Sequence, residues 1–125
     1  MKKFTLPKDG GLIEAGLPEG ILHSYERIPA QIFEDEDVAS ADLADEIIRA
    51  INGSYGTFRL GMTTGTSPVT LYRELVRRHR AGDVSFADVE IFSIDEYYPA
   101  PAPSQSRNAR LYEEFISQID VKPGN

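Results

Sequence analysis

Apolar and polar positions along the chain fall into three blocks, each with a strand-like stretch followed by a helix-like one. In the first block, residues 30–33 alternate weakly and predict a short strand. An acidic run at residues 34–37 then precedes apolar residues spaced three or four apart as far as Gly53. This pattern predicts a helix whose first-turn carboxylates meet the positive end of its dipole. Its apolar positions are Val38, Ala41, Leu43, Ala44, Ile47, Ile48 and Ile51.

The second block joins a strand and a helix through a loop rich in hydroxyl groups. Residues 57–62 predict the strand, and we expect Ser67 to cap the following helix with Pro68 as its first residue. Arginines in the last turn and Gly82 just beyond them predict where this helix ends. The apolar stripe of the helix consists of Leu71, Tyr72, Leu75, Val76 and His79.

The third block begins with an alternating strand at residues 89–94 and continues through a proline-rich loop. Ser106 then opens a last predicted helix, with Leu111, Phe115 and Ile119 spaced four apart. Three strand–helix pairs in succession predict an α/β fold with a mostly parallel sheet, the architecture of doubly wound domains. The first 28 residues are rich in glycine and proline without a sustained period, so they predict an irregular arm before a single domain at residues 29–125.

Composition narrows the possible classes of protein. The 125 residues are 41% hydrophobic and 26% charged, which is ordinary for a globular protein, and they include no cysteine, so disulfides and thiolate chemistry are excluded. The formal net charge of −7 repels a nucleic-acid backbone. Neither a long apolar run nor a secretory pattern occurs, so we expect no membrane span and a cytoplasmic protein.

Two loops at the carboxyl ends of predicted strands are candidates for chemistry, because ligands bind at that edge of an open parallel sheet. The first, residues 63–68, has the sequence Thr-Thr-Gly-Thr-Ser-Pro. Hydroxyls, helix-start amides and a glycine that allows close backbone approach favour an anion such as phosphate. An equally supported alternative is that Ser67 merely caps its helix while the threonines form a turn.

The second loop begins with Asp95 at the end of an apolar strand. We expect this carboxyl to be partly desolvated, a condition that suits a group asked to take and return a proton. On local sequence alone a turn-forming role is favoured, in which Asp95 bonds its own backbone. Glu96 points to the opposite face if the chain stays extended.

The two histidines do not form a recognisable site. His79 lies on the apolar side of its helix near the C-terminus, which predicts a partly buried structural residue, and His23 falls in the arm. Neither has an acid and a hydroxyl at the spacing of a catalytic triad. The acidic run at residues 34–37 is interpreted as a helix start rather than a metal site, because no histidine is near it.

Three segments together resemble the glucosamine-6-phosphate deaminase/isomerase family: residues 60–72 (LGMTTGTSPVTLY), 79–86 (HRAGDVSF) and 91–97 (IFSIDEY). The resemblance extends from about residue 28 to residue 121. It implies a Rossmann-like, three-layer α/β/α fold, shared with 6-phosphogluconolactonases, of which this chain would be about half.

The resemblance also implies roles for particular residues. The sugar phosphate would be held by Thr64, Gly65, Thr66 and Ser67, although the family typically has a second glycine where this chain has Thr66. Asp95 would shuttle a proton between C2 and C1 of the open-chain sugar, with Glu96 and Tyr97 in supporting positions. This role displaces the turn-forming interpretation of Asp95. No redox cofactor or metal is implied.

The family's ring-opening Asp-x-His motif and its basic phosphate ligands lie in a later half with no counterpart here. The leading hypothesis is therefore that this chain is part of an amino-sugar-phosphate deaminase, an enzyme that yields fructose 6-phosphate and ammonia. We expect the isolated chain to be inactive or nearly so, and the protein to form a homo-oligomer. One alternative is a 6-phosphogluconolactonase-like hydrolase, although Tyr97 stands where lactonases tend to have arginine. Another is a non-catalytic module that binds phosphosugars.

Overall fold

The computed structural model describes residues 4–5, 31–99 and 101–125, and the chain divides into two units, Met1–Ala39 and Ser40–Asn125. In the first unit, β1 (Phe4–Thr5) pairs antiparallel with β2 (Gln31–Ile32). The predicted strand therefore exists, but its place in a parallel sheet is wrong, because β2 forms a separate two-stranded sheet. Apart from β1, the predicted irregular arm lies outside the described residues.

The helix after the acidic run is confirmed as α1 (Glu36–Asn52). The Asp35 carboxylate accepts a hydrogen bond of 2.9 Å from the Val38 amide, so the run does start the helix. Farther along, Ala44 and Ile48 are buried on the predicted apolar face. None of the helices in the described ranges is long and apolar enough to cross a bilayer.

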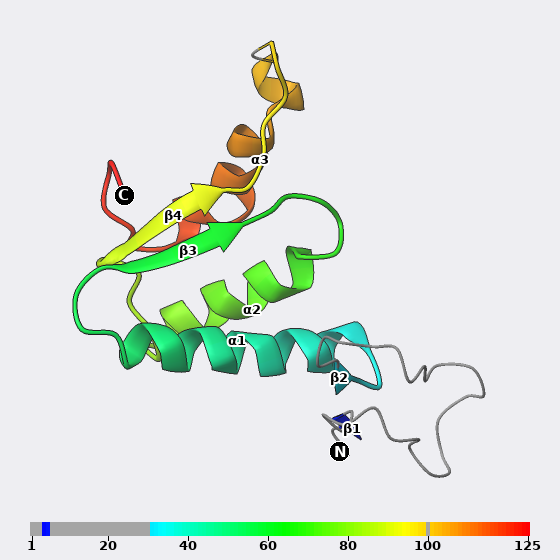
Figure 1. Ribbon diagram of the computed structural model, residues 1–125, viewed down its shortest axis with the longest axis vertical. Helices are drawn as coiled ribbons and strands as arrows, with labels where there is room; N and C mark the ends of the chain where they lie inside the picture. The colour runs from blue at the N-terminus through cyan, green and yellow to red at the C-terminus, as the bar shows by residue number, and fades with distance from the viewer. Residues whose placement is uncertain (1–3, 6–30, 100) are drawn as a thin grey trace. The chain divides into compact units, whose positions relative to one another are not determined.

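The second unit contains a parallel strand pair, β3 (Phe58–Met62) and β4 (Val89–Ser93), joined through α2 (Val69–Arg80). Both strands run in the same direction, so the loop from β3 to α2 and the segment after β4 leave the same end of the sheet (Figure 1). The predicted parallel pairing is confirmed for these two strands. Their register places Gly61 opposite Phe92 and Met62 opposite Ser93.

The two faces of this sheet differ. Met62 and Val89 are buried in the core, whereas Phe92 and Ile94 are 53% and 69% exposed and Arg59 pairs with Glu90 across the strands at 2.9 Å. Within the described residues one face is therefore covered by helices, and the other is open to a further layer of the kind that a three-layer fold has. The core comprises Ala44, Ile48, Met62, Tyr72, Leu75, Val76, Val84, Phe86, Val89, Leu111 and Phe115.

The helix α2 ends where the sequence predicts, but it does not begin where the sequence predicts. Gly82 has a φ of +84°, and its amide donates to the His79 carbonyl at 2.9 Å, so it terminates the helix as predicted. At the other end the cap residue is Pro68, and no side chain caps the helix. The predicted cap at Ser67 and the predicted first residue at Pro68 are therefore wrong.

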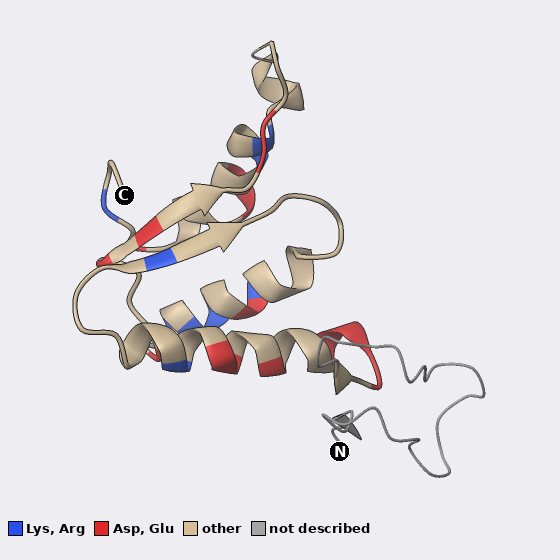
Figure 2. Cartoon of the chain, viewed as in Figure 1, with Lys and Arg blue, Asp and Glu red and all other residues tan. Residues whose placement is uncertain are grey.

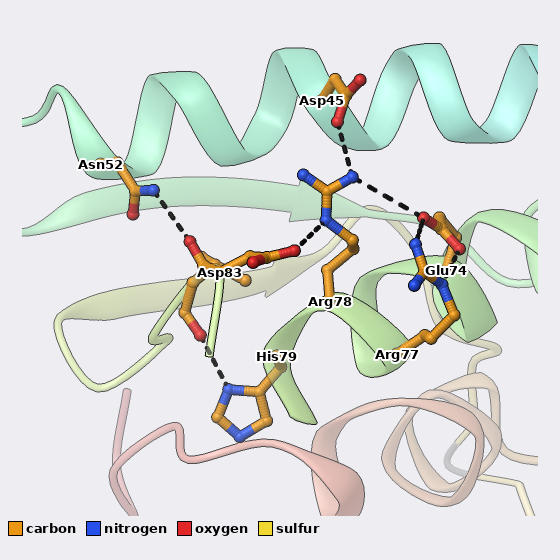
Figure 3. Close-up of polar contacts among 8 residues, drawn as sticks. Asp45, Asn52, Glu74, Arg77, Arg78, His79 and Asp83 are labelled. Carbon is orange, nitrogen blue, oxygen red and sulfur yellow. Dashed lines mark hydrogen bonds and ion pairs between the residues drawn. The ribbon is translucent and has the colours of Figure 1, made fainter. Parts of the chain in front are cut away.

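Charged side chains tie α2 to α1 and to the loop that follows α2. Figure 2 shows acidic residues along α1 and basic residues in the second half of α2. The Arg78 guanidinium contacts Asp45 of α1 at 2.8 Å and also pairs with Asp83 and Glu74 (Figure 3). The Asn52 amide reaches the Asp83 carbonyl at 3.0 Å, so the same loop is fixed from two sides.

His79 is the partly buried structural residue that its position predicts. Its Nδ1 lies 2.9 Å from the Val84 carbonyl, and its ring meets Phe86 edge-on. Asp120 secures the same region, because its carboxylate accepts from the Ser85 hydroxyl and the Phe86 amide, both at 2.6 Å. His23 lies outside the described residues.

The last predicted helix is shorter than its apolar spacing suggests. A 3₁₀ turn at Pro103–Gln105 precedes α3 (Arg107–Glu114), and the Ser106 hydroxyl caps α3 as predicted by accepting from the Ala109 amide at 3.1 Å. Phe115 leaves helical geometry with φ −140° and ψ −61°, and a second 3₁₀ turn follows at Ile116–Gln118. Phe115 is nevertheless fully buried, so packing rather than continued helix explains the apolar spacing.

Candidate functional site

The two loops predicted to carry chemistry leave the same edge of the sheet. The Ile94 amide donates to the Met62 carbonyl at 2.9 Å, which extends the strand pairing to the point where both loops begin. Residues 63–68 follow β3, and Asp95, Glu96 and Tyr97 follow Ile94. The sheet therefore brings the candidate phosphate loop and the candidate acid–base residue to one place.

The loop after β3 combines one buried hydroxyl with exposed ones. Thr64 is buried, with 9% of its surface exposed, whereas Thr66 and Ser67 are exposed. Gly65 has a φ of +148°, a conformation that side-chain-bearing residues rarely adopt, and a Cβ there would meet only Pro68 at 3.9 Å. Backbone conformation, rather than crowding, therefore favours glycine at this position.

Arg107, which the sequence analysis did not single out, connects the two loops. Its Nη1 donates to Thr64 Oγ1 at 3.2 Å, and its Nε lies 3.2 Å from Asp95 Oδ2. Its Nη2 donates to the Tyr97 hydroxyl at 3.2 Å, and the guanidinium carbon lies 4.9 Å from the centre of the Tyr97 ring. One cation thus joins the candidate phosphate loop, the carboxylate and the aromatic residue.

Asp95 does not have the desolvated environment expected of it. Its side chain is 49% exposed in the described structure, and its nearest charged partner is Arg107. The Asp95 carboxylate does not form a turn with its own backbone either, because it faces Arg107. The Asp95 backbone carbonyl instead accepts a hydrogen bond of 3.0 Å from the Ser93 hydroxyl. The group is ion-paired, near the candidate phosphate loop and half-exposed.

Glu96 turns back and caps the start of α3. Its carboxylate accepts from the Ser106 hydroxyl at 2.6 Å, and from the backbone amides of Asn108 at 3.1 Å, Tyr97 at 2.8 Å and Arg107 at 3.1 Å. These bonds lower the pKa of Glu96 to about 2, with the Ser106 hydroxyl the largest cause. Glu96 therefore fixes the backbone from which the Arg107 side chain extends.

A second arginine of α3 also reaches the candidate phosphate loop. Arg110 Nη2 donates to the Gly65 carbonyl at 3.3 Å, while its Nε bonds to Glu114 at 2.7 Å. A cavity of about 800 Å³ lies here, lined by Thr64, Gly65, Tyr97 and both arginines, among others. The volume falls within the range of small-molecule sites.

A sequence signal for these arginines exists but is weak. Arg107 and Arg110 are three residues apart, so they share one face of a short helix that begins where the second loop ends. That face lies at the site because the proline-rich segment turns the chain back and Glu96 bonds to the first amides of α3.

Comparison with known proteins gives a consistent family. Residues 34–125 match the family model described as "Glucosamine-6-phosphate isomerases/6-phosphogluconolactonase". The chain is 39% identical over 95 residues to a glucosamine-6-phosphate isomerase of Candida albicans, covering 75% of this chain and 38% of the relative. It is 38% identical to a glucosamine-6-phosphate deaminase of Aliivibrio fischeri strain MJ11, covering 66% of this chain and 33% of the relative.

A solved structure is similar in fold. A monomeric glucosamine-6-phosphate deaminase superposes with a TM-score of 0.67 at 26% identity, covering 73% of this chain and 38% of that protein. The chain therefore spans well under half the length of the proteins it matches.

Proposed function

The chain belongs to the glucosamine-6-phosphate isomerase/6-phosphogluconolactonase family, and from this premise we propose that it supplies the phosphate loop and the proton-transferring carboxylate of an amino-sugar-phosphate deaminase. The observation that carries the proposal is that Asp95 and Thr64, from two different loops, contact one guanidinium. A proton-transfer group beside an anion-binding loop suits a phosphorylated sugar. The names of the relatives support glucosamine 6-phosphate as the substrate.

In the proposed reaction, the open-chain aminosugar isomerises from aldose to ketose, and water replaces the amine to give fructose 6-phosphate and ammonia. Asp95 takes the proton from C2 and returns it to C1, while Thr64, Gly65, Thr66 and Ser67 hold the phosphate. Tyr97 and Glu96 support these groups through Arg107. The reaction exchanges no electrons with a cofactor, so acid–base groups suffice.

Ring opening and exclusion of water are assigned to a region that this chain does not cover, since it spans 38% of the Candida albicans relative. Asp95 is half-exposed, and proton transfer is efficient only when the base and the substrate are held in one geometry away from water. We therefore expect the 125-residue chain to release ammonia at a negligible rate. Robust turnover by this chain alone would contradict that division of the site.

Binding can be tested on the chain itself. Titration with glucosamine 6-phosphate, followed by amide NMR, should shift the signals of residues 64–67, whereas unphosphorylated glucosamine should not. The matched control is glucose 6-phosphate, which has the phosphate but lacks the amine and should shift the same signals. If all three sugars leave the loop unchanged, the phosphate-binding role of this loop is wrong.

Catalysis can be tested by joining this chain to the remaining portion of the Candida albicans relative. We expect ammonia release from glucosamine 6-phosphate, and its loss when Asp95 is replaced by Asn. Lactone hydrolysis is the second candidate activity. Tyr97 stands at the sequence position where lactonases tend to have an arginine, and here the Arg107 guanidinium lies against the Tyr97 ring and so brings an arginine to the same place. Lactonase activity without ammonia release would make the lactonase, and not the deaminase, the favoured function. Phosphosugar binding with neither activity would favour a non-catalytic binding module.

A cytoplasmic location and self-association complete the proposal. A sugar phosphate is charged and does not cross a bilayer readily, so its enzymes are expected where it is made. The exposed Phe92 and Ile94 on the open sheet face favour contact with another copy or another segment.

A further inference from the structure

The hydroxyl groups at the candidate site are constrained by the chemistry of Arg107. A guanidinium carries only N–H donors, whereas a hydroxyl can both donate and accept. The 3.2 Å contacts from Nη1 to Thr64 and from Nη2 to Tyr97 therefore require both hydroxyls to accept. Each hydroxyl proton is left for a different acceptor.

A second arginine of α3, Arg110, binds a backbone carbonyl of the loop that would otherwise repel an anion. The Gly65 carbonyl accepts from Arg110 at 3.3 Å, so its negative end is compensated. Thr64, Tyr97 and Gly65 all line the cavity of about 800 Å³. The two arginines thereby occupy acceptor atoms of Thr64, Tyr97 and Gly65. Glu113 and Glu114 also line the cavity, and the Glu114 carboxylate is paired with Arg110 at 2.7 Å.

We propose that Arg107 is a positioning residue that makes Thr64 and Tyr97 hydrogen-bond donors to the phosphate group of the substrate. The inference deepens the proposed function and rests on it. Arg107 acts through the two hydroxyls, and its own charge is largely compensated by Asp95 at 3.2 Å. Glu96 supports this role by holding the Arg107 amide at 3.1 Å.

The test measures binding of inorganic phosphate to the 125-residue chain through the amide signals of residues 64–67. Arg107→Gln should weaken binding by about tenfold or more, equivalent to about 1.4 kcal/mol. Arg59→Gln is the matched control, because it removes the same charge from an exposed ion pair on the open sheet face and should change binding less than twofold. Equal effects of the two substitutions would overturn the proposal.

Two further variants separate positioning from simple attraction. Arg107→Lys keeps the charge but lacks the planar fork that reaches both hydroxyls, so it should bind nearly as weakly as Arg107→Gln. In a Thr64→Val, Tyr97→Phe background, adding Arg107→Gln should cost less than threefold, because its partners are already gone. Wild-type affinity in Arg107→Lys, or an undiminished tenfold loss in that background, would refute an indirect role.

The proposed function fails separately from this inference. If the wild-type chain shows no phosphate-dependent shift at residues 64–67, both are wrong. If it binds phosphate and Arg107→Gln binds equally well with its core amide signals unchanged, only the role of Arg107 is wrong.

Discussion

The two serines that precede α2 and α3 lead to contrasting predictions for stability. Ser106 accepts a 3.1 Å bond from the Ala109 amide, whereas α2 has no side-chain cap and Ser67 is exposed. Replacing Ser106 with Ala leaves the Ala109 amide without its acceptor and removes the 2.6 Å hydroxyl bond to Glu96, while Glu96 still bonds to the amides of Arg107 and Asn108. Loss of the cap bond costs about 1 kcal/mol, within a usual range of roughly 0.5–2 kcal/mol, and loss of the bond to Glu96 adds to that cost.

The same substitution at Ser67 should leave stability nearly unchanged, within about 0.5 kcal/mol, as for most exposed positions. In a domain of this size, a loss of about 1 kcal/mol lowers the melting temperature by roughly 3–6 °C. The two variants are therefore distinguishable by thermal unfolding followed by circular dichroism. Urea unfolding of the same samples checks that the m-value, and with it the unfolding cooperativity, is unchanged.

The result that refutes this reasoning is a Ser67→Ala loss equal to or larger than the Ser106→Ala loss. Such a result would mean that Ser67 caps α2 in solution, as the sequence pattern alone predicts. Its hydroxyl would then bond to the helix rather than remain available to a phosphate, which would also weaken the proposed role of Ser67.

Three further predictions concern the core, pH and the open sheet face. Phe86→Ala should cost about 3–5 kcal/mol in urea unfolding, since Phe86 is fully buried, whereas Tyr112→Ala at a 58% exposed position should cost little. The pKa of Glu96 is lowered to about 2, so the stability it provides is complete above pH 4.5 and is lost as pH falls toward 2. Glu96→Gln should flatten the melting temperature over that pH range. Phe92→Ser should reduce self-association in sedimentation without lowering the melting temperature.

Much of the fold could be predicted because local signals and packing agree. The spacing around Ala44 and Ile48 predicts the buried face of α1, and Gly82 ends α2 where its positive φ is needed. The predictions fail where tertiary contacts decide. Gln31 and Ile32 look like any short strand, yet their partner is β1, and sequence alternation does not specify a pairing partner.

The candidate site was only half predictable for a similar reason. Asp95 and the loop at Thr64 stand at strand ends, where an open parallel sheet places its ligands, so their position follows from the strand pattern. Arg107 depends on the path of the proline-rich segment and on the bonds that Glu96 makes to α3. No periodicity encodes that return, and the exposure of Asp95 depends on what packs beside it.

The bonds from Asp120 to Ser85 and Phe86 have a consequence for the order of folding. They join residues 34 and 35 positions apart, and β4 and α3 lie within the stretch of chain that these bonds close into a loop. During synthesis Asp120 emerges 34 residues after Phe86, and until then the segment around Phe86 lacks this anchor. The Asp120 carboxylate can therefore complete the packing around Phe86 only after the segment that contains β4 and α3 has been made.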